Sequence, residues 1–436
     1  MPDPETISTP EPAAGTVPRD EALPAVSVLL GPGAGEALAA SVAGDGGRIE
    51  STRALFVNYS PGKRIAVRYA ARVAWPDGSV SNETLVGTER VGGPPSESAH
   101  VEVAGTTIGV WRWPDDPRLP GLRPATKAVY VRGLLDEMGV PPGPINLSFR
   151  AYWPGRRAVI QAAFTPRRLS FDPASGRLGQ APSQKLVFVK VVRPREAEGL
   201  YRLHKQLEGG LPVARCLGWS EELGILVLEA LPGHTISGCL SGEGGPPPAP
   251  AELVALLARL GEYDVPGEPR RTTAGKIANH VRLLSAIMPD QAERLARFAE
   301  LYGEQRDEPL TTVHGDFHEE QVLSQEGRVS GLLDVDDAGP GQLVDDLALM
   351  VGRVRARAHF AKRGREQAQA YEQALLDEFG RAVDPDELRH RAAGALLGRA
   401  TAPFRGQAKG WPRESRERIA MAETWLERWA RERGSV

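Results

Sequence analysis

The segment from His314 to Asp334 contains the side chains best suited to chemistry. Asp316 follows a short predicted strand, Gln321 comes five residues later, and Asp334 ends a second predicted strand at 329–333. Two strands joined by a short turn would bring these side chains into one cleft. Their carboxylate and amide oxygens are ligands that suit Mg²⁺. A carboxylate that can deprotonate a hydroxyl, beside oxygen ligands for a metal, is what phosphoryl transfer requires.

The spacing of these residues resembles the catalytic segment of a known enzyme family. The sequence His-Gly-Asp at 314–316, followed five residues later by an amide, resembles the catalytic loop of aminoglycoside phosphotransferases and choline-kinase-like enzymes. Asp334, with Asp346 twelve positions later, is similar to that family's metal-binding segment. The resemblance implies that Asp316 is the catalytic base and that Asp334 and Gln321 hold Mg²⁺.

The amide at position 321 departs from the usual family pattern. The family usually has Asn where this chain has Gln321. Glutamine keeps the amide oxygen and adds one methylene, so metal ligation stays open. Gln at this position resembles the maltokinase branch and its aminosugar-kinase relatives, which are also similar in having an extra N-terminal domain. The resemblance therefore implies a sugar or aminosugar acceptor, with an aminoglycoside antibiotic as the alternative.

A lysine inside an apolar strand is the predicted contact to the nucleotide phosphates. Lys190 lies in the predicted strand 185–192, where a buried charge needs an anionic partner. By resemblance this partner is ATP; a sheet-edge lysine that reaches solvent is the alternative. On the next predicted helix, 194–206, Glu196 is expected to orient Lys190, with Glu198 as the other candidate. Acidic residues in a first helical turn are also favoured by the helix dipole alone.

Two further segments are predicted to contact the nucleotide. Residues 228–233, Leu-Glu-Ala-Leu-Pro-Gly, resemble the hinge whose backbone binds adenine, which implies Glu229 and Leu231. An ordinary strand end before a Pro-Gly turn is the alternative. The hairpin at 153–157 lies where a phosphate-covering loop belongs, and Arg156 is its predicted contact. It lacks a Gly-x-Gly-x-x-Gly pattern, and arginines at a turn tip are otherwise solvated.

Other polar residues near the motif have structural interpretations first. His314 and Asp346 are expected to brace the catalytic loop by hydrogen bonds. His318 either lines the cleft or faces water. Asp336 and Asp337 either add negative charge near the metal or form a solvated turn, and the turn is favoured.

Five residues are candidates for an acceptor pocket. Trp411, Trp425 and Trp429 lie in late predicted helices, where core packing is favoured over stacking on a sugar face. Glu319 and Glu320 would suit a cationic acceptor, but the sequence does not place them.

The order of predicted elements is that of a bilobal kinase. Strands come first, then one helix and more strands; after residue 250 the pattern is mostly helical, apart from 311–345. This order predicts a protein-kinase-like α+β fold with a β-rich N-lobe, a helical C-lobe and an extra strand-rich N-terminal cap domain. The predicted divisions are a disordered tail at 1–24, the cap domain at 25–139, the nucleotide-binding N-lobe at 140–232, and the helical C-lobe with catalytic loop and acceptor site at 233–436.

Two hairpins in the strand-rich part match each other. The sequence Tyr-Trp-Pro-Gly-Arg-Arg-Ala-Val-Ile at 152–160 follows Tyr-Ser-Pro-Gly-Lys-Arg-Ile-Ala-Val at 59–67 position by position. The match indicates either an internal duplication of a β-hairpin or chance reuse of a Pro-Gly turn. Two short copies are too few for a solenoid.

Composition excludes several classes of protein. The 436 residues carry a formal net charge of -3 with both signs interspersed, without the basic surplus of a nucleic-acid binder. Cys216 and Cys239 are too few for a disulfide scaffold. The first 19 residues contain no apolar run, and no segment is long enough to span a bilayer. We therefore expect a cytoplasmic protein without nucleic-acid or membrane partners, of open oligomeric state.

Together these features predict transfer of the γ-phosphoryl group from ATP, with Mg²⁺, to a hydroxyl of a small polar molecule. A pseudokinase that binds nucleotide without catalysis is the alternative from another class, supported by Gln321 and the unsettled helix glutamate. Phosphorylation of a protein is disfavoured because no Ala-Pro-Glu segment follows Asp334. The choice between ATP and GTP stays open.

Overall fold

The computed structural model describes residues 17–166, 171–172, 177–178 and 184–434. The chain forms two compact units, each assembled from segments that are distant in the sequence. The described residues of the first unit are 17–113, 271–307 and 386–434; those of the second are 114–270 and 308–385, less the gaps above. This division differs from the predicted one, because residues 114–139 group with the second unit and the helical half is shared between both.

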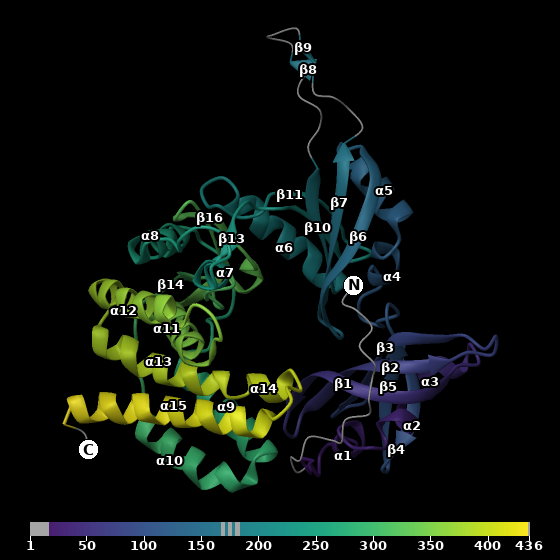
Figure 1. The fold of residues 1–436 in the computed structure, drawn as a ribbon, viewed down its shortest axis with the longest axis horizontal. Coiled ribbons are helices and arrows are strands. Elements are labelled where there is room, and N and C mark those ends of the chain that lie inside the picture. Colours follow the sequence, from purple (N-terminus) through teal and green to yellow (C-terminus); the bar gives the residue numbers. More distant parts are fainter. Residues whose placement is uncertain (1–16, 167–170, 173–176, 179–183, 435–436) are drawn as a thin grey trace. The chain divides into compact units, whose positions relative to one another are not determined.

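A five-stranded antiparallel sheet forms the β-rich part of the second unit, in the order β11-β12-β10-β7-β6. Its strands β10, β7 and β6 lie side by side in Figure 1. Its strands are β6 (Pro142–Trp153), β7 (Arg157–Pro166), β10 (Lys185–Val192), β11 (Cys216–Ser220) and β12 (Ile225–Glu229). In β7 every second side chain is buried, as expected of a strand with one face on the core. Helix α6 (Pro194–Leu207) begins with a proline, which suits the first helical position. The predicted strand at 185–192 and helix from 194 are confirmed.

Helices and short strands make up the rest of the second unit. The helices are α4 (Leu122–Ala125), α5 (Ala128–Glu137), α7 (Ile236–Leu240), α8 (Pro250–Gly261), α11 (Leu343–Phe360) and α12 (Arg365–Ala382). The strands are β8 (Phe171–Asp172), β9 (Arg177–Leu178), β13 (His234–Thr235), β14 (Leu310–Val313), β15 (Val322–Gln325), β16 (Arg328–Leu332) and β17 (Gly339–Gln342), with a 3₁₀ turn, η2, at Val335–Asp337. A β-rich lobe followed by a helical lobe with a strand-flanked loop is the kinase-like α+β fold.

The core of the β-rich lobe lies between α6 and the sheet. Val192 and Leu226 from the sheet meet Ala197 from the helix, and all three are buried. Leu200 and Leu231 pack against this cluster from its edge. The alternation of β10 places Lys190 on the same face as Val192, so the lysine faces the helix side of the sheet.

The first unit contains a second five-stranded antiparallel sheet with the same topology. Its order is β1-β2-β3-β5-β4. The strands are β1 (Arg48–Ser60), β2 (Arg64–Ala74), β3 (Val80–Arg90), β4 (Ala99–Val103) and β5 (Thr106–Arg112). In both sheets the chain's first three strands are neighbours and the fifth lies between the third and fourth. This shared order supports internal duplication over chance reuse of a turn.

Short helices and the C-terminal helices complete the first unit. They are α1 (Val26–Leu29), α2 (Ala34–Leu38), α3 (Ala40–Ala43), α9 (Thr273–Ile287), η1 (Pro289–Gln291), α10 (Ala292–Tyr302), α13 (Pro385–Arg399), α14 (Ala402–Arg405) and α15 (Trp411–Glu432). Helices α9 and α14 contact β1. None of the described helices combines the length and apolarity that a membrane span needs.

The predicted disordered tail, 1–24, includes residues that the structure places in the first unit. Residues 1–16 lie outside the described residues, but 17–24 are placed in the first unit. Leu23 is fully buried, and the hydroxyl of Tyr59 donates a hydrogen bond to Asp20 at 2.8 Å. A single leucine and one carboxylate are too weak a local pattern to reveal this packing.

Candidate active site

The loop between β14 and β15 is held at its start by Asp346. The backbone N–H of His314 donates to Oδ2 of Asp346 at 2.6 Å, and that of Gly315 donates to Oδ1 at 3.0 Å. Nδ1 of His314 accepts from the N–H of Asp316 at 3.3 Å, so its ring proton is on Nε2, 2.8 Å from the carbonyl oxygen of Leu333. The predicted bracing by His314 and Asp346 is confirmed.

A second contact joins the other end of this loop to the same segment. The N–H of Leu333 donates to the backbone oxygen of Gln321 at 2.7 Å. Because Asp334 follows Leu333 directly, both ends of the catalytic loop lie beside the predicted metal ligand. The structure therefore brings together the neighbourhoods of Asp316, Gln321 and Asp334.

Asp316 is accessible and stays ionised near neutral pH. Its side chain is 48% exposed, and Oδ2 lies 3.6 Å from Nε2 of the buried His318. The N–H of Glu320 donates to Nδ1 of His318 at 3.2 Å, and Nε2 of His318 also lies 3.3 Å from Nε2 of Gln321. Burial by itself raises the pKa of Asp316, but the hydrogen bond from His318 and electrostatic attraction to His318, His314 and Arg353 lower it overall. A general base needs this ionised form.

Asp334 belongs to a cluster of four charged side chains. Its Oδ1 lies 2.6 Å from Nη1 of Arg157 and 3.2 Å from Nζ of Lys190, which is also 2.5 Å from Oδ1 of Asp336. Burial by itself raises the pKa of Asp334, but Lys190 and Arg157 outweigh it and lower the pKa to about 2. The backbone of Asp334 is left-handed, with φ 53° and ψ 47°, a conformation that is costly outside glycine and clusters at functional sites.

Lys190 pairs with two aspartates and not with the helix glutamate that was expected to orient it. The residue is only 6% exposed and pairs with the two aspartates, so the sheet-edge alternative is excluded. Among the described residues, Glu196 pairs with Arg193 and Glu198 with Arg202. Both glutamates lie near the start of α6, where neighbouring arginines and the helix dipole attract them. The expected Lys190–Glu196 pair is not formed.

The predicted hinge begins with the last two residues of β12 and continues to Gly233. The carboxylate of Glu229 pairs with Arg215 at 3.0 Å, and Leu231 packs against the α6 core. Gly233 has a φ of 107°, and a Cβ there would lie 2.5 Å from the carbonyl oxygen of Ser324, so the turn requires glycine. An adenine-binding role of Glu229 and Leu231 stays a prediction.

The hairpin arginine that reaches the cluster is Arg157 and not Arg156. Arg156 is exposed in the turn, whereas the Arg157 guanidinium lies 4.5 Å from the ring centre of Trp153 and contacts Asp334. Sequence reasoning chose the turn tip and missed the next residue. Strand alternation carries the signal: Lys190 pairs with Val159, two residues after Arg157, so both cations lie on one face of the sheet.

Asp336 was also misjudged, because its side chain is only 15% exposed and pairs with Lys190. Asp337 fits the predicted turn: its side chain is 54% exposed.

The oxygen donors fit a magnesium–nucleotide complex rather than an ion held by protein alone. Among the described residues, no group of three or more His, Cys, Asp or Glu side chains forms a metal cluster. Mg²⁺ is ordinarily held by one or two carboxylates, substrate phosphates and water. A role of Asp334 and Gln321 as its protein ligands stays a prediction.

The residues considered for an acceptor pocket make structural contacts. Glu319 is buried and pairs with Arg353 at 3.0 Å. In the first unit, Nε1 of Trp425 and of Trp429 donate to backbone oxygens of α13 at 2.8 and 3.0 Å, and Trp411 is buried. These contacts favour core packing for the tryptophans.

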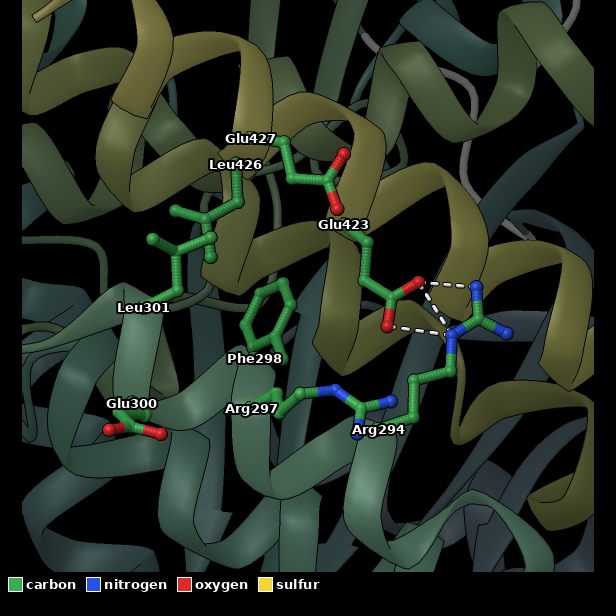
Figure 2. Close-up of a pocket in the computed structure, with 8 residues that line it drawn as sticks. All are labelled: Arg294, Arg297, Phe298, Glu300, Leu301, Glu423, Leu426 and Glu427. Atoms are coloured by element: carbon green, nitrogen blue, oxygen red, sulfur yellow. Dashed lines mark hydrogen bonds and ion pairs between the residues drawn. The ribbon is translucent and has the colours of Figure 1, made fainter. Parts of the chain in front are cut away.

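A separate pocket of about 540 Å³ lies between α10 and α15 in the first unit (Figure 2). Phe298, Leu301 and Leu426 form its apolar side, and Arg294 pairs with Glu423 at its rim. The predicted catalytic, metal-binding and nucleotide-binding residues all lie in the second unit, so this pocket is not the candidate site for phosphoryl transfer.

Comparison with protein families agrees with this geometry. Residues 184–393, just under half of the chain, match the model described as "Phosphotransferase enzyme family" (APH). The matched segment includes Lys190, Asp316 and Asp334. Together with the kinase-like fold, the match defines the class: the protein is a phosphotransferase of the small-molecule kinase type. A search of curated proteins gave no match.

Several solved structures are similar to this chain at low identity. Aminoglycoside phosphotransferase APH(3'')-Id from Streptomyces rimosus is 17% identical with a TM-score of 0.38, covering 62% of this chain and 97% of that one. A choline/ethanolamine kinase family protein from Mesorhizobium loti is 15% identical with a TM-score of 0.41, covering 56% of this chain and 85% of that one. Macrolide 2'-phosphotransferase MphH from Brachybacterium faecium is 15% identical with a TM-score of 0.42, covering 67% of this chain and 97% of that one. The maltokinase and aminosugar-kinase branch stays a prediction.

Proposed function

We propose that this protein transfers the γ-phosphoryl group of ATP to a hydroxyl group of a small polar molecule. One observation carries the proposal: Lys190 and Arg157 converge on Asp334, and the residue before Asp334 is bonded to both ends of the loop that carries Asp316. A base, a metal ligand and two cations for phosphate are thereby gathered in one unit.

In the proposed reaction Asp316 accepts the proton of the acceptor hydroxyl. The hydroxyl oxygen then bonds to the γ-phosphorus while the bond from that phosphorus to the β–γ bridging oxygen breaks, and ADP leaves. The proton passes from Asp316 to solvent, which reaches the half-exposed carboxylate. Lys190 and Arg157 bind the phosphates and balance their charge. Mg²⁺, when bound, supplies further neutralisation of the phosphate oxygens.

We propose a sugar or aminosugar as the acceptor. Gln321 and the additional N-terminal sheet support this choice, because both resemble the maltokinase and aminosugar-kinase branch. Phosphate transfer to glucosamine, maltose, other sugars and aminoglycosides should be measured side by side. Turnover of aminoglycosides alone would replace the proposed acceptor with the alternative one.

The role of Asp316 is tested by Asp316→Asn, which keeps the shape and removes the base. Loss of a positioned base costs about 10²–10⁴-fold in rate, so we expect kcat to fall by that order. Binding of Mg²⁺ and a non-hydrolysable ATP analogue, measured by calorimetry, should stay close to wild type. Unchanged turnover would refute the assignment. A wild-type protein that binds the analogue but transfers phosphate to no acceptor would favour the pseudokinase alternative.

A further inference from the structure

A buried carboxylate holds the hairpin that presents Arg157. Asp116 is 4% exposed, and its Oδ2 accepts from the hydroxyl of Tyr152 at 2.8 Å and from the N–H of Gly155 at 2.7 Å. Its Oδ1 accepts from the N–H of Arg118 at 2.9 Å. Tyr152 lies near the end of β6 and Gly155 lies in the turn, so one side chain fixes both parts of the hairpin.

The same hairpin leads directly into the charged cluster. Arg157 comes two residues after Gly155 as the first residue of β7, lies over the ring of Trp153 and contacts Asp334. A shift of the turn would therefore move this cation relative to Asp334. We call the contacts of Asp116 with Tyr152 and Gly155 the hairpin latch.

The first unit contains a matching latch on its own hairpin. Oδ2 of Asp20 accepts from the hydroxyl of Tyr59 at 2.8 Å and from the N–H of Gly62 at 2.7 Å. Its Oδ1 accepts from the N–H two residues on, that of Ala22, at 3.1 Å. The backbone oxygens of both aspartates accept from a leucine N–H three residues later at 3.1 Å. The sequence Asp-x-x-Leu-Pro occurs at 20–24 and at 116–120.

The two copies differ in the residue that the sheet places beside the hairpin. In the second unit Lys190 pairs with Val159, two residues after Arg157. At the corresponding register of the first unit, Thr88 pairs with Ala66. Where α6 connects β10 to β11, residues 91–98 form only a loop between β3 and β4. The first copy thus keeps the latch without the phosphate-binding lysine.

We infer that Asp116 is a positioning residue for nucleotide binding, holding Arg157 beside Asp334 through Tyr152 and Gly155. This inference rests on the proposed function. The first-unit latch supplies an internal control, because it makes the same hydrogen bonds on a hairpin whose sheet has threonine in place of the lysine.

The test uses two pairs of matched variants in the full chain. Asp116→Asn and Tyr152→Phe break the latch in the second unit; Asp20→Asn and Tyr59→Phe break the same bonds in the first. Calorimetry with Mg²⁺ and a non-hydrolysable ATP analogue gives Kd, and steady-state kinetics gives KM for ATP and for the acceptor. Small misplacements of a positioning group cost up to about 100-fold. We expect a roughly 10- to 100-fold higher Kd and ATP KM for the first pair, an unchanged acceptor KM, and wild-type values for the second pair.

The outcomes separate the latch from the proposed function. Wild-type Kd and ATP KM in both Asp116→Asn and Tyr152→Phe would overturn the positioning role while leaving the kinase assignment intact. Equal losses in Asp20→Asn would also overturn it, because they would indicate general destabilisation. If Asp116→Asn fails to fold, Tyr152→Phe decides, since it removes one hydroxyl only. Failure of the wild-type protein to bind the nucleotide analogue would overturn the proposed function, and the nucleotide role of the latch with it.

Discussion

At the scale of single residues, the site is governed by two cations and two carboxylates in close contact. Lys190 and Arg157 neutralise Asp334 and Asp336 in this structure. A nucleotide with Mg²⁺ would bring both a metal for Asp334 and phosphates for the cations, so we expect the pairs to exchange partners on binding. Arg157 is well suited to this exchange because a guanidinium bonds a carboxylate or a phosphate with the same geometry.

Replacing Arg157 by glutamine should weaken nucleotide binding. A hydrogen bond to a charged group contributes about 1.5–3 kcal/mol, so Arg157→Gln is expected to raise the Kd for Mg²⁺ and the ATP analogue about tenfold or more. Arg156→Gln, one residue away and exposed, should change it little. Calorimetry on the two variants decides between the arginine that the sequence favoured and the one that the structure favours; a larger effect at position 156 would refute our choice.

At the scale of elements, the catalytic loop depends on the first turn of α11. Asp346 receives two backbone N–H groups from the loop, so the helix sets where the loop begins. The loop's far end is bonded to the segment after β16. The segments that carry Asp316 and Asp334 are therefore held by hydrogen bonds to the backbone beside these residues.

The variant Asp346→Asn should impair catalysis through the loop. An asparagine has one acceptor oxygen, so its NH₂ group would face one of the two N–H donors and displace the loop. We expect kcat to fall about 10- to 100-fold, with a smaller change in KM for ATP. Asp337→Asn, on an exposed turn residue, is the control. Equal kcat in both variants would show that the loop does not need Asp346.

At the scale of the whole molecule, each unit is assembled from distant segments. In the first unit, the N-terminal sheet groups with helices from 271–307 and 386–434. Its helical part contains a fully buried ion pair, in which Nε of Arg391 donates to Glu387 at 2.8 Å and Nη2 donates to the backbone oxygen of Arg306. His390, which directly precedes Arg391 on α13, stacks on Trp429 with ring centres 4.2 Å apart.

Removing the charge of Glu387 should destabilise the first unit strongly. The variant Glu387→Gln removes a negative charge that faces a fully buried guanidinium, and breaking a buried ion pair costs about 3 kcal/mol of unfolding free energy. Glu417→Gln is the matched control, because it breaks an exposed pair with Arg413 at the same helical spacing, worth under about 0.5 kcal/mol. Urea unfolding followed by circular dichroism measures both. Similar losses would mean that the buried pair has no special role.

The amino-acid sequence by itself determined the features that depend on residues close together in the chain. Strand β10 and helix α6 follow from local periodicity and from Pro194. The spacing of Asp316, Gln321 and Asp334 predicted that their segments lie together, which the structure confirms, because the strands of this segment are joined by short turns. The repeated Pro-Gly hairpin was visible for the same reason.

The tertiary structure alone decided which distant residues meet. Lys190 pairs with Asp334 and Asp336 and not with the nearby Glu196. The arginine that contacts Asp334 is Arg157 and not Arg156. The grouping of the C-terminal helices with the first sheet had no readable sequence signal, and the repeated Asp-x-x-Leu-Pro did not by itself reveal that Asp116 contacts the hairpin. These contacts join residues that are tens to hundreds of positions apart, where register and packing, not local propensity, select the partner.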